Sequence, residues 1–187
     1  MKRLMTAVLS LFLIGCADSA PSLPETTAAP QETLPAQDTA SLQEGFHEGK
    51  TGETMHTAFF DFSAESARLL RQYEDYEPQE GNALLGVQMR IRNTTDRDIT
   101  MYDTDFKITW SDEDDGWTVP LTYLTAISGQ NLLKTEYLLR PDEEIAGDLV
   151  FEVPEGESFF CLSYLEQFDD ESKGDLFGVY FETEELK

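Results

Sequence analysis

The chain has 187 residues, and its 37 acidic side chains against 13 lysines and arginines give a formal net charge of −24. This balance excludes nucleic acid and anionic lipid head groups as main partners, because both are bound through clustered basic side chains. A chain this acidic is typical of a soluble protein with a solvated surface, and it leaves cation binding open.

The N-terminus carries the pattern of a bacterial lipoprotein signal peptide, or lipobox. Lys2 and Arg3 precede an apolar run over residues 4–14, and a glycine stands directly before Cys16. This run is shorter than the ~20 apolar residues that span a bilayer. The pattern predicts cleavage of a signal peptide, 1–15, and lipid attachment to Cys16, which holds the protein on the extracytoplasmic face of the cell membrane. The alternative is an ordinary secretory signal with an incidental cysteine.

The segment after Cys16 is rich in Ala, Pro, Thr, Gln, Glu and Ser, and it has few large apolar residues. Such a segment buries too little apolar surface to offset the entropy of the chain. Residues 16–50 are therefore predicted to be the lipidated cysteine and a disordered linker. Residues 51–187 have the length of one domain.

A period of two, the signature of β-strands, begins in the first part of this domain. A strand is expected over 55–62, and it either continues through a bulge over 63–73 or gives way there to a short helix. An acidic loop is expected over 74–81. The next strand is the clearest one, because four apolar residues alternate with small or polar residues: Leu85, Val87, Met89 and Ile91.

The second half of the domain repeats the pattern. Phe106, Ile108 and Trp110 alternate before an acidic turn, and a return strand from Trp117 completes a predicted hairpin. Further strands are expected over 145–153, 159–164 and 176–181. These make about seven or eight short strands, with no sustained helical pattern to connect a parallel sheet. The fold class is therefore all-β, an antiparallel β-sandwich, with a closed barrel as the second choice.

The tip of the predicted hairpin is the candidate metal site. Calcium takes several oxygen ligands, which clustered carboxylates supply. The spacing does not match an EF-hand loop, since Gly116 stands where a further acidic or amide ligand is required. Asp103 and Asp105 lie nearby in the sequence, and a second acidic run follows at 169–171. The candidate ligands at the tip are Asp112, Glu113, Asp114 and Asp115.

The sequence predicts no catalytic residue, and the protein is expected not to be an enzyme. Cys161 lies in an aromatic stretch and is expected to be a small buried side chain. A reactive thiol needs a nearby histidine or basic group. The two histidines are His47, in the expected linker, and His56, near the start of a strand. The sequence also has neither a glycine-rich phosphate loop nor a cluster of zinc ligands.

Four segments in this order resemble a bacterial family of immunoglobulin-like domains of unknown function, found in Gram-positive surface lipoproteins. They are 85–94, which ends in Asn-Thr, then 102–106, 139–143 and 149–154. The chain is also similar in expected fold to a secreted immunogenic mycobacterial protein. The resemblance implies an immunoglobulin-like β-sandwich at the cell surface, and it transfers no catalytic residue. Asp142 stands where the family usually has glycine.

Two functions fit these features. The first is a non-enzymatic binding or accessory module that contacts a cell-envelope or extracellular protein or polymer through a sheet edge or the loops at one end. The alternative is a calcium-binding or calcium-sensing domain at the cell surface. Neither function involves nucleic acid.

Overall fold

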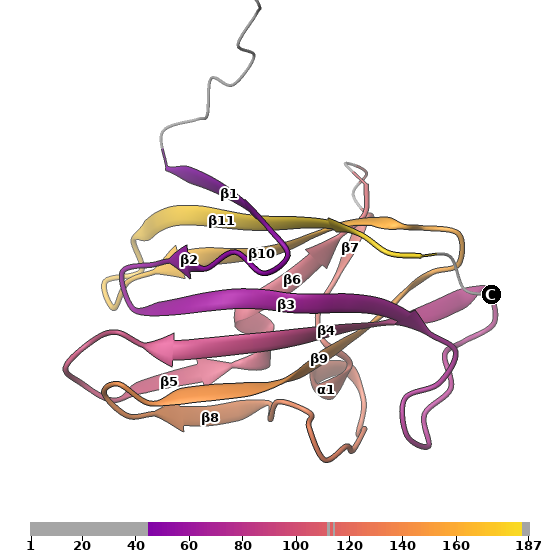
Figure 1. The fold of residues 1–187 in the computed structure, drawn as a ribbon, viewed down its shortest axis with the longest axis horizontal. Helices are drawn as coiled ribbons and strands as arrows, with labels where there is room; N and C mark the ends of the chain where they lie inside the picture. Colours follow the sequence, from indigo (N-terminus) through magenta and orange to yellow (C-terminus); the bar gives the residue numbers. More distant parts are fainter. Residues whose placement is uncertain (1–44, 112, 114, 185–187) are drawn as a thin grey trace, which may run out of the picture. The chain divides into compact units, whose positions relative to one another are not determined.

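Eleven strands, one short helix and one 3-10 turn form the described part of the chain, residues 45–111, 113 and 115–184, in this computed structural model (Figure 1). The elements are β1 (Phe46–Lys50), β2 (Met55–His56), β3 (Phe60–Leu70), β4 (Asn82–Asn93), β5 (Ile99–Tyr102), η1 (Asp103–Asp105), β6 (Phe106–Thr109), β7 (Trp117–Thr118), α1 (Leu121–Leu124), β8 (Glu136–Leu139), β9 (Glu144–Pro154), β10 (Phe159–Gln167) and β11 (Lys173–Glu182).

The strands form a β-sandwich, as the sequence predicts. One sheet has the order β1-β11-β10-β6-β7 and the other the order β2-β3-β4-β9, while β5 and β8 form a separate pair. Every neighbouring pair is antiparallel except β1 and β11, which run parallel. Within the described residues no helix is both long and apolar enough to cross a membrane.

The alternating residues of β4 face the core, which confirms the expected pattern. Leu85, Val87, Met89 and Ile91 are fully buried, whereas the arginines between them are exposed. Aromatic rings fill the space between the sheets, and two examples are Phe62 against Phe106 at 5.3 Å and Phe60 against Tyr164 at 4.7 Å between ring centroids. Rings at these separations add to the stability that comes from burial.

The first expected strand is divided into two. Thr57 interrupts it, because its hydroxyl accepts hydrogen bonds from the backbone N–H groups of Phe59 and Phe60 and bends the chain between β2 and β3. Beyond this turn β3 continues to Leu70 with a shift of register after Ala64. The bulged strand is therefore the correct alternative for this segment, and the short helix is wrong.

Strand β1 lies inside the segment 16–50 that the sequence analysis assigned to a disordered linker. It pairs with β11, and the His47 ring stacks on Phe177 at 4.7 Å while its Nε2 bonds to Asp175 at 2.8 Å. A short polar strand is ordered here because the edge of β11 supplies its backbone partners. The expected boundary at residue 50 is thus too late. The signal peptide 1–15 and Cys16 lie outside the described residues.

The turn from β8 to β9 explains the departure from the family pattern at Asp142. This residue has a φ of 61°, in the left-handed region where glycine is favoured. Aspartate tolerates that conformation better than most side chains. The Glu143 N–H donates to the Arg140 carbonyl at 3.0 Å and closes the turn.

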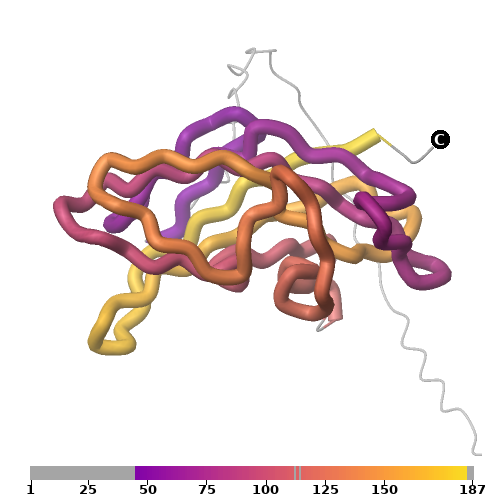
Figure 2. Tube along the Cα trace, turned by 90° about the horizontal axis from the view of Figure 1, so that it is seen from below, coloured from indigo at the N-terminus to yellow at the C-terminus, as the bar shows by residue number. Residues whose placement is uncertain are grey.

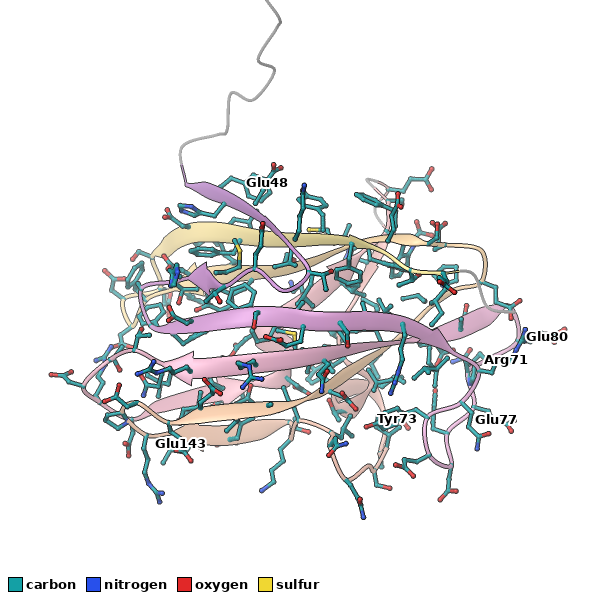
Figure 3. The ribbon with its side chains drawn as sticks, viewed as in Figure 1. Glu48, Arg71, Tyr73, Glu77, Glu80 and Glu143 are labelled. Carbon is teal, nitrogen blue, oxygen red and sulfur yellow. The ribbon has the colours of Figure 1, made fainter. Side chains whose placement is uncertain are left out.

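A small second cluster covers the outer face of the β2-β3-β4-β9 sheet. Leu84 of β4 and Val150 of β9 pack with Leu121 of α1, and all three are at most 2% exposed. Next to this cluster the loop after β3 folds back over the same face. Figure 3 shows Tyr73 and Glu77 of this loop at one end of the sheets, opposite the end that carries Glu143. The helix and the loop thus make a partial third layer.

Glu152 fastens this loop to the sheet. Its carboxylate accepts hydrogen bonds from the Tyr76 hydroxyl at 2.7 Å, the Gln79 N–H at 2.8 Å and the Asn82 amide at 2.8 Å. Burial raises the pKa of this carboxyl, but the three hydrogen bonds outweigh it and hold the pKa below the usual value. The ionised group is therefore part of the folded structure at neutral pH.

Replacing Glu152 with alanine should lower the free energy of unfolding by about 1–2 kcal/mol, because three hydrogen bonds to a charged acceptor are lost at a partly solvated site. A lowered pKa means that this stabilisation is present above the unfolded pKa and is lost as pH falls through the folded pKa. Urea unfolding at pH 7 and pH 3 measures both effects. Glu155→Ala, at an exposed position in the turn that follows β9, is the control. Equal losses at both pH values would contradict the assignment.

Candidate functional site

A cleft of about 840 Å³ opens at one end of the sandwich. The turn between β10 and β11 projects at this end, on the same side as the connection from β4 to β5 (gold and magenta, at the left of Figure 2). Its walls come from β5, η1, the last part of β10 and the turn before β3. The main lining residues are Phe59, Arg97, Asp98, Thr100, Tyr102, Asp105, Lys107, Tyr164, Leu165, Phe168 and Asp169.

The cleft exists because β6 covers only part of the length of β10 in the larger sheet. Strand β10 pairs with β6 only over Cys161–Tyr164, whereas its pairing with β11 continues to Gln167. On the other side β5 pairs with β8 alone. The turn η1 carries the chain from β5 into β6, and so the end of β10 and one edge of β5 border the same open space.

Asp105 is the main ionisable group of the cleft. Its Oδ2 accepts a hydrogen bond from the Tyr102 N–H at 2.8 Å. Burial raises the pKa of this carboxyl to about 6, against that hydrogen bond, and the nearby charge of Asp103 adds to the increase. A carboxyl whose pKa is raised by burial in a cleft is a candidate functional group.

A buried polar layer lies next to Asp105. Asp103 is 1% exposed and accepts a hydrogen bond from the Thr122 hydroxyl of α1. Its Oδ1 and the Tyr137 hydroxyl are buried, and neither has a hydrogen-bond partner within the described part of the chain. Burial raises the pKa of both groups, and the charges of Asp105 and Asp103 raise that of Tyr137 further. These uncompensated groups lower stability, which is common beside sites that bind ligands.

The basic residues of the cleft have other contacts. The guanidinium of Arg97 lies 3.8 Å from the Asp169 carboxylate, and the Lys107 ammonium stands 4.9 Å from the centre of the Trp117 ring. The rings of Phe59 and Phe168 meet at 5.2 Å and form an apolar rim. The lining is thus polar and apolar in similar measure, and this rim is its apolar part.

Replacing Asp105 with asparagine should stabilise the protein at pH 7.5 on the order of 1–2 kcal/mol, because the amide keeps an acceptor for the Tyr102 N–H and removes a buried charge. The raised pKa means that wild-type stability falls as pH rises from about 4 through 6. The variant should lack this loss. Thermal unfolding between pH 4 and pH 8 tests it, with Asp142→Asn as an exposed control. A variant less stable than wild type at pH 7.5 would overturn the electrostatic argument.

The structure separates the acidic residues that the sequence analysis grouped. Asp103 and Asp105 precede β6, whereas the hairpin tip follows its other end. Of the hairpin candidates, Glu113 and Asp115 are described, and they follow the opposite end of β6 from Asp103 and Asp105. Asp112 and Asp114 lie outside the described residues, and among the residues that are described no group of three or more metal ligands gathers. Calcium binding at the tip stays a prediction.

The remaining candidates lie apart from the cleft lining. His56 bonds through Nδ1 to Asp61 at 2.7 Å on the surface. Cys161 is half-buried, and burial raises the pKa of its thiol to about 11, which keeps it protonated at neutral pH. The sequence analysis missed the cleft residues because what they share is a place at the gap between β5 and β10, which leaves no pattern in the sequence. The only hint in the sequence was the Asp-Thr-Asp run before Phe106.

Comparisons with known proteins give a family and a fold. The model of a domain of unknown function, DUF4352, matches residues 49–173. A crystal structure from Bacillus subtilis described as "a putative lipoprotein (ycdA)" has 14% identity and a TM-score of 0.54, over 72% of this chain and 39% of that one. The yjhA protein of the same organism has 15% identity and a TM-score of 0.52, over 73% and 99%. The chain thus spans well under half of the first protein, and both likenesses concern the fold. No curated protein matches.

Proposed function

The chain belongs to the family of the domain of unknown function DUF4352, and from that premise we propose a lipid-anchored binding module on the extracytoplasmic face of a bacterial cell membrane. The module binds an envelope or extracellular ligand in the cleft between β5 and β10, without catalysis. The observation that carries this proposal is the cleft itself, with the partly buried Asp105 in its lining, on the turn between β5 and β6.

Three observations support the anchor. The residues before Cys16 have the composition of a lipoprotein signal. A protein of similar fold from Bacillus subtilis is described as a "putative lipoprotein". The resemblance of four segments to immunoglobulin-like domains of Gram-positive surface lipoproteins points to the same location. An anchored domain of this kind meets its ligand outside the membrane.

The composition of the cleft supports binding over catalysis. General acid–base chemistry needs a second group at a suitable distance, and nucleophilic chemistry needs a base beside the nucleophile. Within the lining, burial raises the pKa of Asp105 toward neutral pH. Burial also raises the pKa of Tyr164, but there the shift is further above neutral pH. Ser163, also in the lining, has no histidine among the other residues that line the cleft. This arrangement recognises a ligand and does not fill the roles of an active site.

A photocrosslinking residue in place of Phe168, on the rim of the cleft, tests the site in intact cells. Phe159, the first residue of β10, is also exposed and lies outside the cleft lining, and it is the matched control position. We expect a saturable adduct from position 168 that is absent from position 159. Identical adducts from both positions, or none from position 168, would contradict the proposed site. Mass spectrometry of the adduct identifies the chemical class of the ligand.

A further inference from the structure

The edge of β5 that borders the cleft offers backbone groups to a ligand. The N–H of Asp103 donates to the Thr135 carbonyl at 3.1 Å, which continues the β5–β8 ladder by one residue. Hydrogen-bonded residues alternate along an antiparallel strand, and so Met101 also faces β8 while Thr100 and Tyr102 point their backbone groups the other way. The bond from Tyr102 N–H to Asp105 agrees with this direction.

Thr100 is therefore the residue of β5 that presents both a backbone N–H and a carbonyl to the cleft. Thr100 lines the cleft and is exposed. Within the described residues, neither its N–H nor its carbonyl has a backbone hydrogen-bond partner on another element. Across the cleft, residues 165–167 of β10 have no strand on the side where β6 has ended. The cleft is therefore bordered by two strands, β5 and the end of β10, that each have an edge without a paired strand among the described residues.

The charged side chains that line the cleft indicate which kind of ligand fits it. Arg97 is close to Asp169, and Lys107 lies over the Trp117 ring, so both cations of the lining have contacts of their own. Asp98 and the Oδ1 atom of Asp105 have no ion pair with any residue that the structure describes. The lining has three carboxylates against two cations, and since both cations have contacts of their own, Asp98 and Asp105 are left to attract a basic group.

We propose that the cleft accepts an extended peptide segment of a partner protein, which adds a strand to the edge of β5 at Thr100 and places a lysine or arginine on Asp105. This inference rests on the proposed function, since it names the ligand class of the same cleft. Backbone pairing supplies affinity in strand addition, and the alternate side chains supply specificity. The apolar rim of Phe59 and Phe168 covers the neighbouring side chains of the peptide.

Two synthetic peptides test the proposal on the full-length protein by NMR titration. Both are capped heptapeptides of alternating threonine and valine, one with lysine at its centre and the other with glutamate. The lysine peptide should bind at least about ten-fold more tightly, because a charge-assisted hydrogen bond to Asp105 replaces repulsion. It should also slow hydrogen exchange of the Thr100 amide. Equal binding of the two peptides would overturn the charge selection.

Two variants separate the side-chain contact from the backbone contact. Asp105→Asn should remove the preference for lysine, whereas Asp142→Asn, an exposed carboxylate outside the cleft, should keep it. Thr100→Pro should abolish binding of both peptides, because proline lacks the N–H, and its ring is tolerated where that N–H faces away from β8. Unchanged binding by Thr100→Pro, or no protection of the wild-type Thr100 amide, would overturn strand addition.

Failure of this inference differs from failure of the proposed function. If neither peptide shifts the cleft resonances while the crosslink from position 168 persists, the cleft binds a ligand of another class, such as a wall polymer, and the peptide inference is wrong. If the lysine peptide binds but position 168 captures nothing in cells, the peptide chemistry holds and the proposed cellular function loses its support.

Discussion

Replacing Asn93 with alanine should lower the free energy of unfolding by about 2–4 kcal/mol, because the Leu139 carbonyl and the Thr95 N–H lose this partner and the Arg97 carbonyl keeps only the Thr95 hydroxyl. The side chain is fully buried at the end of β4. Its amide donates to the carbonyls of Arg97 at 2.8 Å and Leu139 at 3.0 Å, and its Oδ1 accepts from the Thr95 N–H at 2.8 Å. Urea unfolding at pH 7 measures the change.

The contrast with the adjacent threonine makes this test specific. Thr94→Ala changes an exposed side chain and should alter the free energy of unfolding by less than about 0.5 kcal/mol. Asn93→Asp should be as damaging as alanine, since it removes both donors and buries a charge. A loss below about 1 kcal/mol for Asn93→Ala would show that the bonds to Arg97 and Leu139 are replaced by water.

Asn93 also connects the fold to the cleft. Through its amide, one side chain joins the end of β4, the turn that carries Arg97 and the last residue of β8. Since β8 is the partner of β5, the wall of the cleft depends on this contact. The sequence analysis identified an Asn-Thr pair at the end of this strand, and the bond from the Thr95 N–H to the Asn93 side chain shows that a turn begins there.

The long strands were predictable because a local pattern decides them. In β4, apolar and polar residues alternate from Val87 to Arg92 and their burial alternates in the same way, because a strand with one face in the core permits no other register. The same logic identified β9 and its end at Pro154, which lacks the N–H that pairing requires. These elements needed no knowledge of their neighbours.

The short strands were missed because tertiary pairing decides them. β5 and β8 have four residues each and pair only with one another. β1 is polar and owes its conformation to the free edge of β11 and to the contacts of His47 with Phe177 and Asp175. A period of two needs more residues than these strands contain. Pairing partners far apart in the sequence leave no local signal.

The cleft follows from those missed elements, and so the sequence could not reveal it. Asp105 stood among the acidic candidates only as a neighbour of the hairpin, and its role depends on the path of the chain from β5 through η1 into β6. What raises its pKa is burial, a property of the assembled domain.

Replacing Cys16 with serine should abolish lipid attachment completely, because the thiol is the group that the lipoprotein pathway acylates in the expected signal. The acyl chains are the proposed membrane anchor, and each buried methylene contributes ~0.8 kcal/mol to membrane binding. Labelling of cells with an alkyne-tagged fatty acid, followed by mass spectrometry of the N-terminal peptide, measures the loss.

Cys161→Ser is the matched control for this experiment, since it removes the other of the two cysteines in the chain. That thiol is half-buried in β10 and stays protonated, so it should contribute nothing to labelling. Label that persists in Cys16→Ser would place the lipid elsewhere and remove the basis of the anchor. Label lost in Cys16→Ser and kept in Cys161→Ser would support a tethered domain that presents its cleft outside the membrane, which is the location that a peptide ligand requires.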